Sequence, residues 1–346
     1  MSAFAARLVA WHAAHGRHDL PWQRTRDPYA IWISEIMLQQ TQVATVIPYY
    51  RRFLERFPNV ATLAAAPLDA VLAQWSGLGY YSRARNLHRA AQSIVRDHGA
   101  RFPRDRDAVQ GLPGVGRSTA AAICVFAFGD RHAILDGNVK RVLARHFGIA
   151  GYPGEAQVES ALWKMAESLL PRKGIRAYTQ ALMDLGAGVC TRHRPKCEAC
   201  PVAEACVAYA RGLVAALPAP RPRKTLPHRT TVMPVLEHAG KVFLERRPPA
   251  GIWGGLWCFP ELAHSADVIA ECARRYGVRI ARVIPLETVE HGFTHFRLTI
   301  VPWRVQLARA SLRAAEEGTA WFSVEEARAA AVPAPVRRIL LDLEGR

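Results

Sequence analysis

The tract "LPAPRPRKTLPHR", from Leu217 to Arg229, divides the chain into two parts of different texture. It carries proline at four positions among several basic residues, which is typical of an extended linker. Before it, apolar residues recur at the three- and four-residue spacing of helices; after it, apolar and polar residues alternate as in strands. We therefore predict a multidomain α and α+β chain, with a helical domain at residues 1–212, a linker at 213–228 and an α+β domain at 229–346.

The length and the net charge of the chain limit the kinds of function that it can have. With 346 residues, each of two domains can bury its own core. Lys and Arg total 46 against 29 Asp and Glu, a formal charge of +17. This excess favours a polyanionic partner, DNA or RNA ahead of an acidic membrane surface, although it also fits a protein that is merely kept soluble by charge.

The sequence has no unbroken apolar stretch of the roughly 18 residues that a membrane span needs. Arg7, His12 and His15 interrupt the apolar start, so we expect no signal peptide. The expected location is the reducing cytoplasm, where cysteines serve as metal ligands or buried thiols rather than in disulfides.

Several helix boundaries are readable in the first part. Asp27-Pro28 resembles a helix start, with Asp as the cap and Pro in the first turn. "GLGYYSRARNLHRAAQSIVRDHG", from Gly77, indicates a turn that opens a basic helix, and "LPGVGRSTAAAICVFAFG" a short loop and an apolar helix that ends at Gly129. "LDGNVKRVLARHFG" predicts a further helix that starts near Asp136.

In the second part, "TTVMPVLEHAGKVFLERR" alternates around Ala239-Gly240 and predicts a hairpin. "FTHFRLTIVPWRV" indicates another strand, and "SADVIAECARRYG" and "SVEEARAAAV" indicate short helices.

Four cysteines lie close together in the sequence: Cys190, Cys197, Cys200 and Cys206 are separated by six, two and five residues. Four thiolates at such spacing in a reducing compartment predict one metal centre. The spacing alone leaves zinc and an iron-sulfur cluster both open. The other cysteines, at positions 124, 258 and 272, have apolar or helical surroundings and are expected in the core.

Two further segments have both a plain and a functional interpretation. The glycines of "LPGVGRSTA" precede a helix N-terminus, where backbone N–H groups can meet a phosphate, or the loop is an ordinary helix connection. Glu35 is the only acid between Asp27 and Glu55 and has apolar neighbours. It is either a solvated helix residue or a general acid whose pKa is raised by desolvation.

Taken together, these motifs resemble those of a known family. "LPGVGRSTA", an Asp eighteen residues after Ser118, and the cysteine cluster resemble the helix-hairpin-helix base-excision glycosylases of the endonuclease III superfamily. "SEIMLQQTQV", "GLGYYSRARNLH", "LDGNVKRVL" and the second domain resemble MutY-type adenine DNA glycosylases in particular. The resemblance covers nearly the whole chain.

The resemblance implies a two-lobed helical glycosylase domain, a 4Fe-4S cluster on the four cysteines and a Nudix-like C-terminal domain. It implies a monomeric, nucleoid-associated enzyme that binds double-stranded DNA and removes adenine mispaired with 8-oxoguanine or guanine. Other repair proteins could bind through the linker.

The resemblance also assigns roles. A base must be flipped out of the duplex before it is excised. Glu35 matches the acid that protonates adenine, and Asp136 the carboxylate that stabilises positive charge on the sugar, in a logic that parallels glycoside hydrolysis. Asn138 matches a polar partner near the sugar and the attacking water. A plain helix cap is the alternative for both Asp136 and Asn138.

Ser118 stands where bifunctional relatives have a nucleophilic lysine, which implies a monofunctional enzyme. Lys140 is expected to contact phosphate rather than to form a Schiff base. The loop that precedes the helix is expected to contact DNA through Leu112, Gly114, Gly116 and Ser118.

Gln40 and Tyr80 match residues that insert into the base stack around the mispair. The alternative for Tyr80 is a core aromatic residue. Trp22 and Gln180 match adenine-pocket positions, with a core or helix-surface role as the alternative.

In the second domain, Phe293-Thr294-His295 stands where the family has Phe-Ser-His for reading 8-oxoguanine. Thr keeps the hydroxyl and adds a methyl group; its plain alternative is the start of a strand. The segment "ELAHSADVIAECARRYG" has too few Glu residues for magnesium-dependent pyrophosphate hydrolysis. We therefore expect this domain to recognise a lesion rather than hydrolyse a nucleotide.

Overall fold

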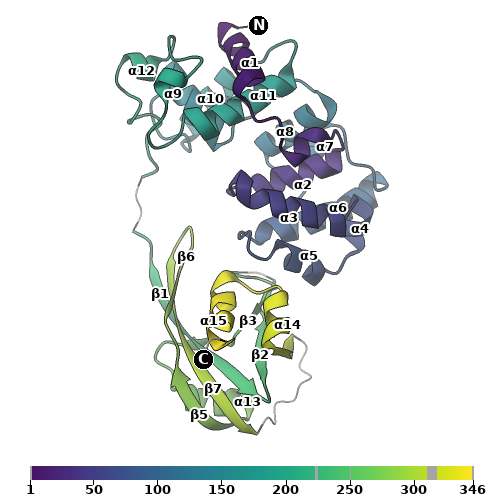
Figure 1. Cartoon of the computed structure of the whole chain (residues 1–346), viewed down its shortest axis with the longest axis vertical. Helices are drawn as coiled ribbons and strands as arrows, with labels where there is room; N and C mark the ends of the chain where they lie inside the picture. The colour runs from purple at the N-terminus through teal and green to yellow at the C-terminus, as the bar shows by residue number, and fades with distance from the viewer. Residues whose placement is uncertain (1, 223–224, 250, 310–317, 345–346) are drawn as a thin grey trace. The chain divides into compact units, whose positions relative to one another are not determined.

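The computed structural model describes residues 2–222, 225–249, 251–309 and 318–344. The chain forms two compact units (Figure 1). The helical unit contains Met1–Ala64 and Arg89–Arg223, and the sheet unit contains Ala65–His88 and Lys224–Arg346. Helix α6, Ser82–His98, begins in the sheet unit and ends in the helical unit.

The helical unit is built of helices joined by short turns. Its elements are α1 (Ala3–His15), a 3-10 turn (Pro21–Arg24), α2 (Pro28–Leu38), α3 (Val43–Arg56), α4 (Val60–Ala65), α7 (Arg106–Gln110), α8 (Arg117–Phe128), α9 (Gly137–Phe147), α10 (Ala156–Ser168), α11 (Ile175–Asp184), a π-helical turn (Leu185–Val189), a second 3-10 turn (Cys197–Ala199) and α12 (Val207–Ala210). No described helix has the length and apolar character needed to span a membrane.

Helix α2 starts where its sequence predicts. The Asp27 carboxylate accepts hydrogen bonds from the N–H groups of Tyr29 and Ala30, and Pro28 occupies the first turn. The helix is apolar almost all round, because it lies inside the unit with Trp32, Ile33 and Met37 fully buried. Each buried side chain of this size contributes about 1.5–3 kcal/mol to folding.

A second core fixes the helices on the other side of the unit. It is formed by buried residues of α1, α8, α9, α10 and α11, with Leu8, Val139, Leu143 and Leu162 fully inaccessible. Helix α8 packs against both α2 and α11 and so joins the two lobes. As predicted, α8 ends at Gly129, which caps it in the left-handed conformation.

In the part of the chain that the structure describes, the sheet unit contains a mixed sheet of eight strands with the central order β3-β2-β1-β7-β5. The strands are β1 (His228–His238), β2 (Lys241–Arg246), β3 (Trp257–Cys258), β4 (Leu262–Ala263), β5 (Arg279–Pro285), β6 (Val289–Gly292), β7 (Arg297–Arg309) and β8 (Thr319–Ser323). The predicted hairpin is confirmed, since β1 pairs antiparallel with β2 across Ala239 and Gly240. Strands β1 and β7 are parallel, with His228 opposite Arg297.

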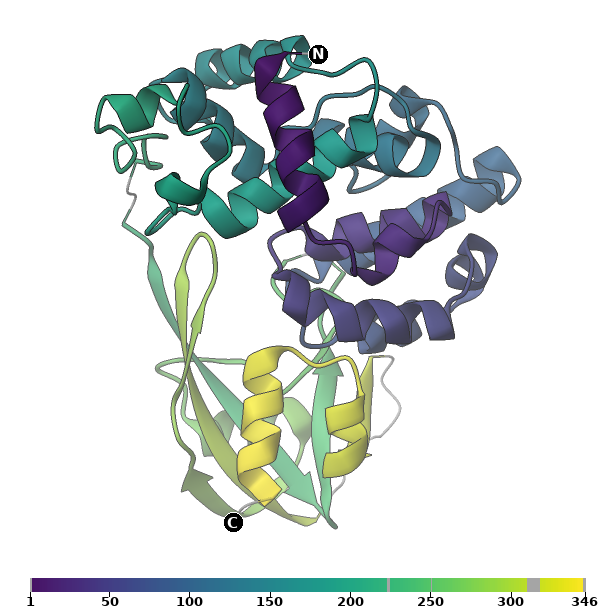
Figure 2. The same ribbon diagram turned by 45° about the horizontal axis from the view of Figure 1, so that its top comes forward.

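Helices cover both faces of this sheet (Figure 2). Helix α13 (Val268–Tyr276) buries Cys272 against strand residues that include Val232, Leu236 and Val305. Helices α14 (Val324–Ala329) and α15 (Ala334–Glu344) lie together on the opposite face in both views. The predicted helices at α13 and α14 are confirmed, with Asp267 and Ser323 as their N-caps.

The sheet unit also includes α5 (Leu68–Trp75) and the first turns of α6. This segment is bonded to the C-terminal part of the chain: Ser76 Oγ donates to the Val332 carbonyl at 3.3 Å, and the Arg85 guanidinium to the Gly254 carbonyl at 2.7 Å. The expected helical domain, residues 1–212, therefore does not coincide with one compact unit.

Two details differ from expectation. The strand predicted from Phe293 begins only at Arg297, because residues 293–296 form a tight turn closed by a 2.9 Å bond from Phe293 N to the Phe296 carbonyl. The linker expected at 213–228 has no helix or strand from 213 to 222, and β1 already begins at His228. Arg223 and Lys224, inside that linker, lie outside the described residues.

Candidate active site

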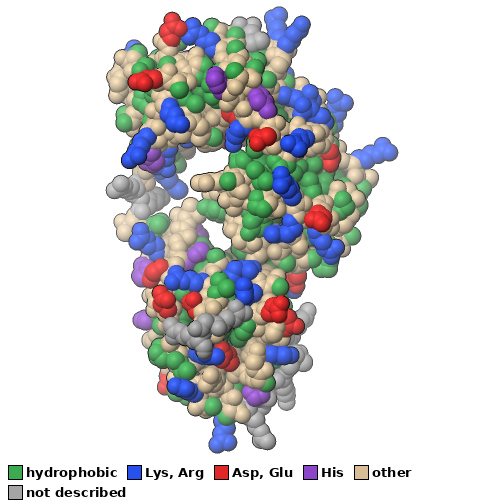
Figure 3. Space-filling model, in the orientation of Figure 1, with side chains coloured by type: hydrophobic (Ala, Val, Ile, Leu, Met, Phe, Trp, Pro, Cys, Tyr) green, Lys and Arg blue, Asp and Glu red, His purple; other side chains and the backbone are tan. Residues whose placement is uncertain are grey.

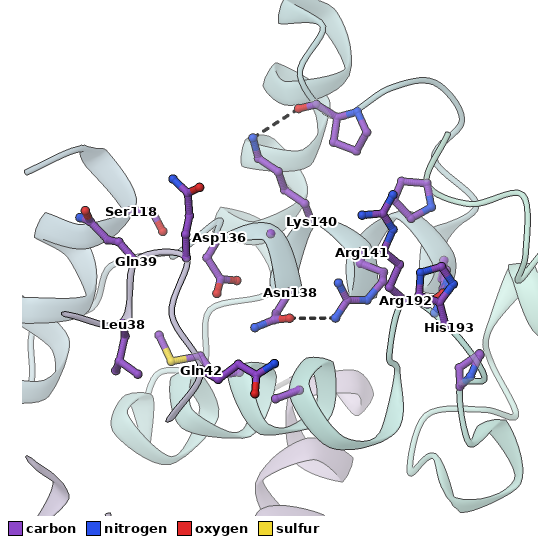
Figure 4. Close-up of a pocket in the computed structure, with 18 of the residues that line it drawn as sticks. Leu38, Gln39, Gln42, Ser118, Asp136, Asn138, Lys140, Arg141, Arg192 and His193 are labelled. Carbon is purple, nitrogen blue, oxygen red and sulfur yellow. Dashed lines mark hydrogen bonds between the residues drawn. The ribbon is translucent and has the colours of Figure 1, made fainter. Parts of the chain in front are cut away.

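A pocket of about 1780 Å³ opens within the helical unit. Its wall includes the C-terminal half of α2 with the turn that follows, the first turns of α8 and α9, and the loop after the π-helical turn (Figure 4). A small-molecule site usually has about 300–1,000 Å³. This space is therefore large enough for a nucleotide together with neighbouring backbone.

Glu35 lies in this wall. Its neighbours on α2 are buried, whereas Glu35 itself is half-buried and lines the pocket. Burial, with the negative charge of Asp136 as a second cause, raises the pKa of Glu35 to about 8. A carboxyl group with this pKa carries a proton at neutral pH and can donate it.

Asp136 is the N-cap of α9. Its carboxylate accepts a hydrogen bond from Val139 N at 2.8 Å. Burial raises the pKa of Asp136, while hydrogen bonds from Val139 and Asn138 and the positive charge of Arg141 act in the opposite direction. The hydrogen bonds and the positive charge favour the ionised form of Asp136, whereas burial and the neighbouring negative charge favour the protonated form of Glu35.

Asn138 is fixed by two neighbours. Its side chain hydrogen-bonds Asp136, and its Oδ1 accepts from the Arg141 guanidinium at 2.8 Å (Figure 4). Arg141 in turn donates to the carbonyls of Gly186 and Cys190, both at 2.7 Å. One guanidinium thus joins the start of α9 to the loop that carries the first cluster cysteine.

Ser118 faces the same pocket from the first turn of α8. Its Oγ accepts a hydrogen bond from Leu135 N at 2.9 Å, directly before Asp136. The turn between α7 and α8 places Gly114 in a left-handed conformation, φ 81°, and Gly116 at the N-cap of α8; both are exposed, whereas Leu112 is buried. A turn with exposed glycines directly before a helix N-terminus lets an oxygen-rich anion approach the backbone closely.

Basic side chains predominate in the pocket wall. Among the described residues of the wall, the two carboxyl groups, of Glu35 and Asp136, are outnumbered by Arg and Lys at positions 17, 140, 141, 145, 192, 194 and 221. Figure 3 shows further Lys and Arg side chains spread over the surface of the same unit. Lys140 donates to the Glu159 carboxylate at 2.6 Å and to the Pro153 carbonyl at 3.3 Å. The wall thus has the charge expected for binding a polyanion.

Known proteins combine these same parts. The family model of HhH-GPD superfamily base excision DNA repair proteins matches residues 33–168, and that of the NUDIX domain matches residues 231–342. Adenine DNA glycosylase of Buchnera aphidicola subsp. Baizongia pistaciae is 36% identical over 342 residues, which cover 99% of this chain and 97% of that protein. The chain belongs to the adenine DNA glycosylase family. It is a DNA N-glycosylase of the base excision type, which confirms the resemblance seen in its motifs.

Other relatives of this glycosylase agree. Adenine DNA glycosylase of Mus musculus is 36% identical over 400 residues, covering 98% of this chain and 77% of that protein. The structure of a thermostable thymine-DNA glycosylase has a TM-score of 0.56 and 35% identity, and covers 60% of this chain and 95% of that one. A non-covalent endonuclease III–DNA complex, with a TM-score of 0.53, 23% identity and coverage of 61% and 95%, shares the fold.

The four clustered cysteines of this glycosylase line one cavity of about 30 Å³. The buried Arg145 side chain donates to Cys190 Sγ at 3.5 Å and to the Thr191 carbonyl at 2.7 Å, and its own carbonyl accepts from Cys206 Sγ at 3.5 Å. Among the described residues, no group of three or more His, Cys, Asp or Glu is arranged to hold a metal ion. Four thiols that line one cavity are nevertheless a donor set that suits either a zinc ion or an iron-sulfur cluster.

Gln40 and Tyr80 share an unusual backbone. Gln40 lies in the turn after α2 with φ 58° and lines the pocket, and Tyr80, in the sheet unit, has φ 48° and a 47% exposed side chain. Non-glycine residues adopt this left-handed region at a cost, and besides turns they do so at functional sites.

Trp22 and Gln180 are not among the described residues that line the pocket. Trp22 is buried edge-to-face against Tyr50, with ring centroids 5.4 Å apart. Gln180 is buried and donates to the Asp184 carboxylate at 2.9 Å, which also accepts from the Arg17 side chain at 2.7 Å.

The Phe293-Thr294-His295 turn stands on an aromatic cluster in the sheet unit. Phe293 is half-buried and stacks on Phe296 with centroids 4.5 Å apart, while Thr294 and His295 are exposed. Trp253 packs 5.5 Å from Phe293, from a loop that the sequence did not connect with this turn. Stacked aromatic rings beside two exposed polar side chains can bind a planar ligand.

Sequence reasoning missed Arg141, Arg145 and Trp253. Arg141 stands three residues after Asn138 on a helix, a spacing that places the two side chains together. No local signal connects Arg145 with Cys190, or Trp253 with Phe293, because these contacts join distant segments.

Proposed function

We propose that this glycosylase removes adenine mispaired with 8-oxoguanine or guanine from double-stranded DNA and leaves an abasic site. The observation that carries the proposal is the pair of carboxyl groups in one basic pocket: Glu35, with its pKa raised to about 8, and Asp136 at a helix N-terminus. Two carboxyl groups in opposite protonation states are what cleavage of a glycosidic bond requires.

In the proposed reaction, the flipped adenine enters the pocket and Glu35 transfers its proton to the purine ring. The C1′–N9 bond then breaks, and its electron pair leaves with adenine. Asp136 stabilises the positive charge on the sugar. A water molecule oriented by Asn138 adds to C1′ and gives its proton to the carboxylate that Glu35 has become, so that the sugar becomes an abasic site and Glu35 is protonated again.

The pocket supports a monofunctional reaction. Ser118 occupies the position of the lysine of bifunctional relatives, and its hydroxyl is engaged as the acceptor for Leu135 N. Lys140, an amine in the same wall, is paired with Glu159. A Schiff base would require a free amine at C1′.

We assign the proposed contacts with DNA to residues of both units. Leu112, Gly114, Gly116 and Ser118 belong to the phosphate-facing turn, Gln40 and Tyr80 insert beside the mispair, and Trp22 and Gln180 support the adenine pocket. Phe293, Thr294 and His295 read 8-oxoguanine. Along the sequence we propose a helical glycosylase domain at 1–212, a linker at 213–228 and a lesion-recognition domain at 229–346, with the segment Ala65–His88 belonging to the compact unit of the last. We further propose a cytoplasmic, nucleoid-associated monomer to which repair partners could bind through the linker.

We propose a 4Fe-4S cluster on Cys190, Cys197, Cys200 and Cys206. When bound, it would cross-link the loop beside the pocket and keep its basic residues in place. Arg145 would donate to one ligating sulfur and hold the loop backbone. Metal analysis and the visible charge-transfer absorption of iron thiolates distinguish this cluster from zinc; a colourless zinc protein would overturn the assignment.

The decisive assay is single-turnover cleavage of duplexes that carry adenine opposite 8-oxoguanine or guanine, developed with alkali. We expect cleavage of the adenine strand, faster opposite 8-oxoguanine. A duplex with thymine opposite guanine serves as the control, since one similar structure is a thymine-DNA glycosylase. Uncleaved adenine strands, or a covalent adduct trapped by borohydride, would contradict the proposal.

A further inference from the structure

The turn at residues 76–81, which we call the Tyr80 turn, joins α5 to α6 in the sheet unit. Gly77, Gly79 and Tyr80 all have positive φ, at 103°, 73° and 48°. Two of these are glycines and adopt such values without penalty, but Tyr80 does not. Since the Tyr80 side chain is 47% exposed, burial of its ring is not enough to hold the conformation.

Bonds from inside the segment hold one side of the turn. The Arg83 guanidinium, which is buried, donates to the carbonyls of Leu78 and Gly79 at 3.2 and 3.1 Å. Trp75 Nε1 donates to the Gly79 carbonyl at 3.2 Å. The same guanidinium lies 5.6 Å from the centroid of the Tyr80 ring. These contacts fix the two residues that precede Tyr80.

The other side of the turn is held by the C-terminal part of the chain. The Tyr81 hydroxyl donates to the Val332 carbonyl at 3.1 Å, and Gly77 N donates to the same hydroxyl at 3.4 Å. Ser76 Oγ also donates to the Val332 carbonyl, at 3.3 Å, and accepts from the Arg337 guanidinium at 2.7 Å. Val332 is fully buried, between α14 and α15.

A second connection runs toward the Phe293 turn. Arg85, on the first turn of α6, donates to the Gly254 carbonyl at 2.7 Å. Gly254 follows Trp253, whose ring packs 5.5 Å from Phe293. A hydrogen bond and a ring contact therefore connect the Tyr80 turn with the Phe293 turn, although more than 200 residues separate them in the sequence.

We propose that the Tyr81 hydroxyl and Arg337 are positioning residues for mispair recognition. They connect the Tyr80 turn to the α14–α15 connection and hold Tyr80 in its left-handed conformation, with its ring directed outward. The inserting side chain and the surface that reads 8-oxoguanine would thereby reach the lesion as one unit. The inference rests on the proposed function of Tyr80 as an inserting residue.

A double-mutant cycle tests this coupling. Tyr81→Phe keeps the ring and removes the hydroxyl; Tyr80→Ala removes the inserting ring. We expect Tyr81→Phe to slow single-turnover excision opposite 8-oxoguanine about 3- to 10-fold, the effect of one hydrogen bond. In the Tyr80→Ala background it should have no further effect, because Tyr81 acts through Tyr80. A 2-aminopurine beside the lesion should report a parallel loss of the insertion signal.

Arg337→Met provides a second variant. Arg338→Met is its matched control, because Arg338 is the next residue of α15 and its side chain pairs with the exposed Glu287 instead of with Ser76. We expect Arg337→Met to behave like Tyr81→Phe and Arg338→Met like the wild type. Additive losses in the Tyr80 cycle, or equal effects of the two arginine variants, would overturn the coupling alone. A neutral Tyr80→Ala would overturn both the coupling and the proposed insertion by Tyr80.

Discussion

Glu35 and Asp136 line the same pocket, and the charge of Asp136 adds to burial in raising the pKa of Glu35 to about 8. The two carboxyl groups come from different lobes of the helical unit, one from the middle of α2 and the other from the N-cap of α9. Their coupling is electrostatic, so it has a direct consequence for the dependence of rate on pH.

We predict a bell-shaped pH profile for single-turnover excision. The rate should fall as pH rises through about 8, where Glu35 loses the proton that it donates. It should also fall at low pH, through a value above the ordinary pKa of Asp, where Asp136 becomes neutral. Rates measured on the adenine–8-oxoguanine duplex across this range check the prediction; a flat profile through neutral and alkaline pH would exclude Glu35 as the acid.

The raised pKa of Glu35 also has an effect on stability. Between the ordinary value of 4.5 and about 8, the folded state binds a proton that the unfolded state has released. Unfolding therefore releases that proton, and the Glu35 contribution to the free energy of unfolding decreases as pH rises through this window. Above it, the folded state carries a desolvated charge.

Glu35→Gln removes this titration. We expect the variant and the wild type to unfold at similar denaturant concentrations near about pH 5, and the variant to be the more stable one near about pH 9. Urea midpoints of both proteins at the two pH values measure the difference, in which other titrating groups cancel. A difference that does not change with pH would show that Glu35 has an ordinary pKa.

Asp136→Asn separates the charge of this residue from its capping role. Asn is also a good N-cap, so Val139 N keeps an acceptor and α9 should remain intact. We expect excision to fall on the order of 100- to 1,000-fold, the loss seen when a preorganised electrostatic group is removed, while affinity for the duplex stays within a few-fold. Full activity would refute the charge-stabilising role.

The same variant provides a second readout. Loss of the Asp136 charge removes one cause of the raised pKa of Glu35, so the alkaline limb of the residual activity should move to lower pH. An unchanged limb would indicate that the two carboxyl groups do not interact.

Short sequence patterns predicted the ends of helices and strands better than they predicted the residues of the active site. Asp27-Pro28, Gly129 and Ala239-Gly240 mark boundaries because caps and turns are decided by neighbouring residues. Glu35 could not be assigned locally, since a glutamate on a helix is ordinary unless the helix is buried on all sides. That burial is a property of the packed unit and not of the short sequence around Glu35.

Long-range contacts account for what remained unpredicted. Arg145 reaches Cys190 across 45 positions, and Tyr81 reaches Val332 across 251. In neither pair does the sequence around one residue contain a pattern that predicts contact with the other. The assignment of Phe293 to a strand was wrong because one backbone hydrogen bond closes a turn at 293–296. The alternation of apolar and polar residues does not predict that hydrogen bond.

Gly186, in the π-helical turn, lies directly beside Asn138. A Cβ on Gly186 would stand 2.6 Å from Asn138 Cβ and 3.2 Å from its Cα, closer than packed atoms tolerate. Because one of these atoms is backbone, the start of α9 has to shift. Asn138 would then lose its alignment with Asp136 and Arg141.

Gly188, two residues further along the same turn, is the matched control, since a Cβ there would meet no atom within 4 Å. We expect Gly186→Ala to slow excision about 10- to 100-fold through misplacement of Asn138, and Gly188→Ala to keep the wild-type rate. Iron content and visible absorption should remain unchanged in both variants, because neither glycine is a ligand. Equal rates in the two variants would mean that the position of Asn138 does not limit the reaction.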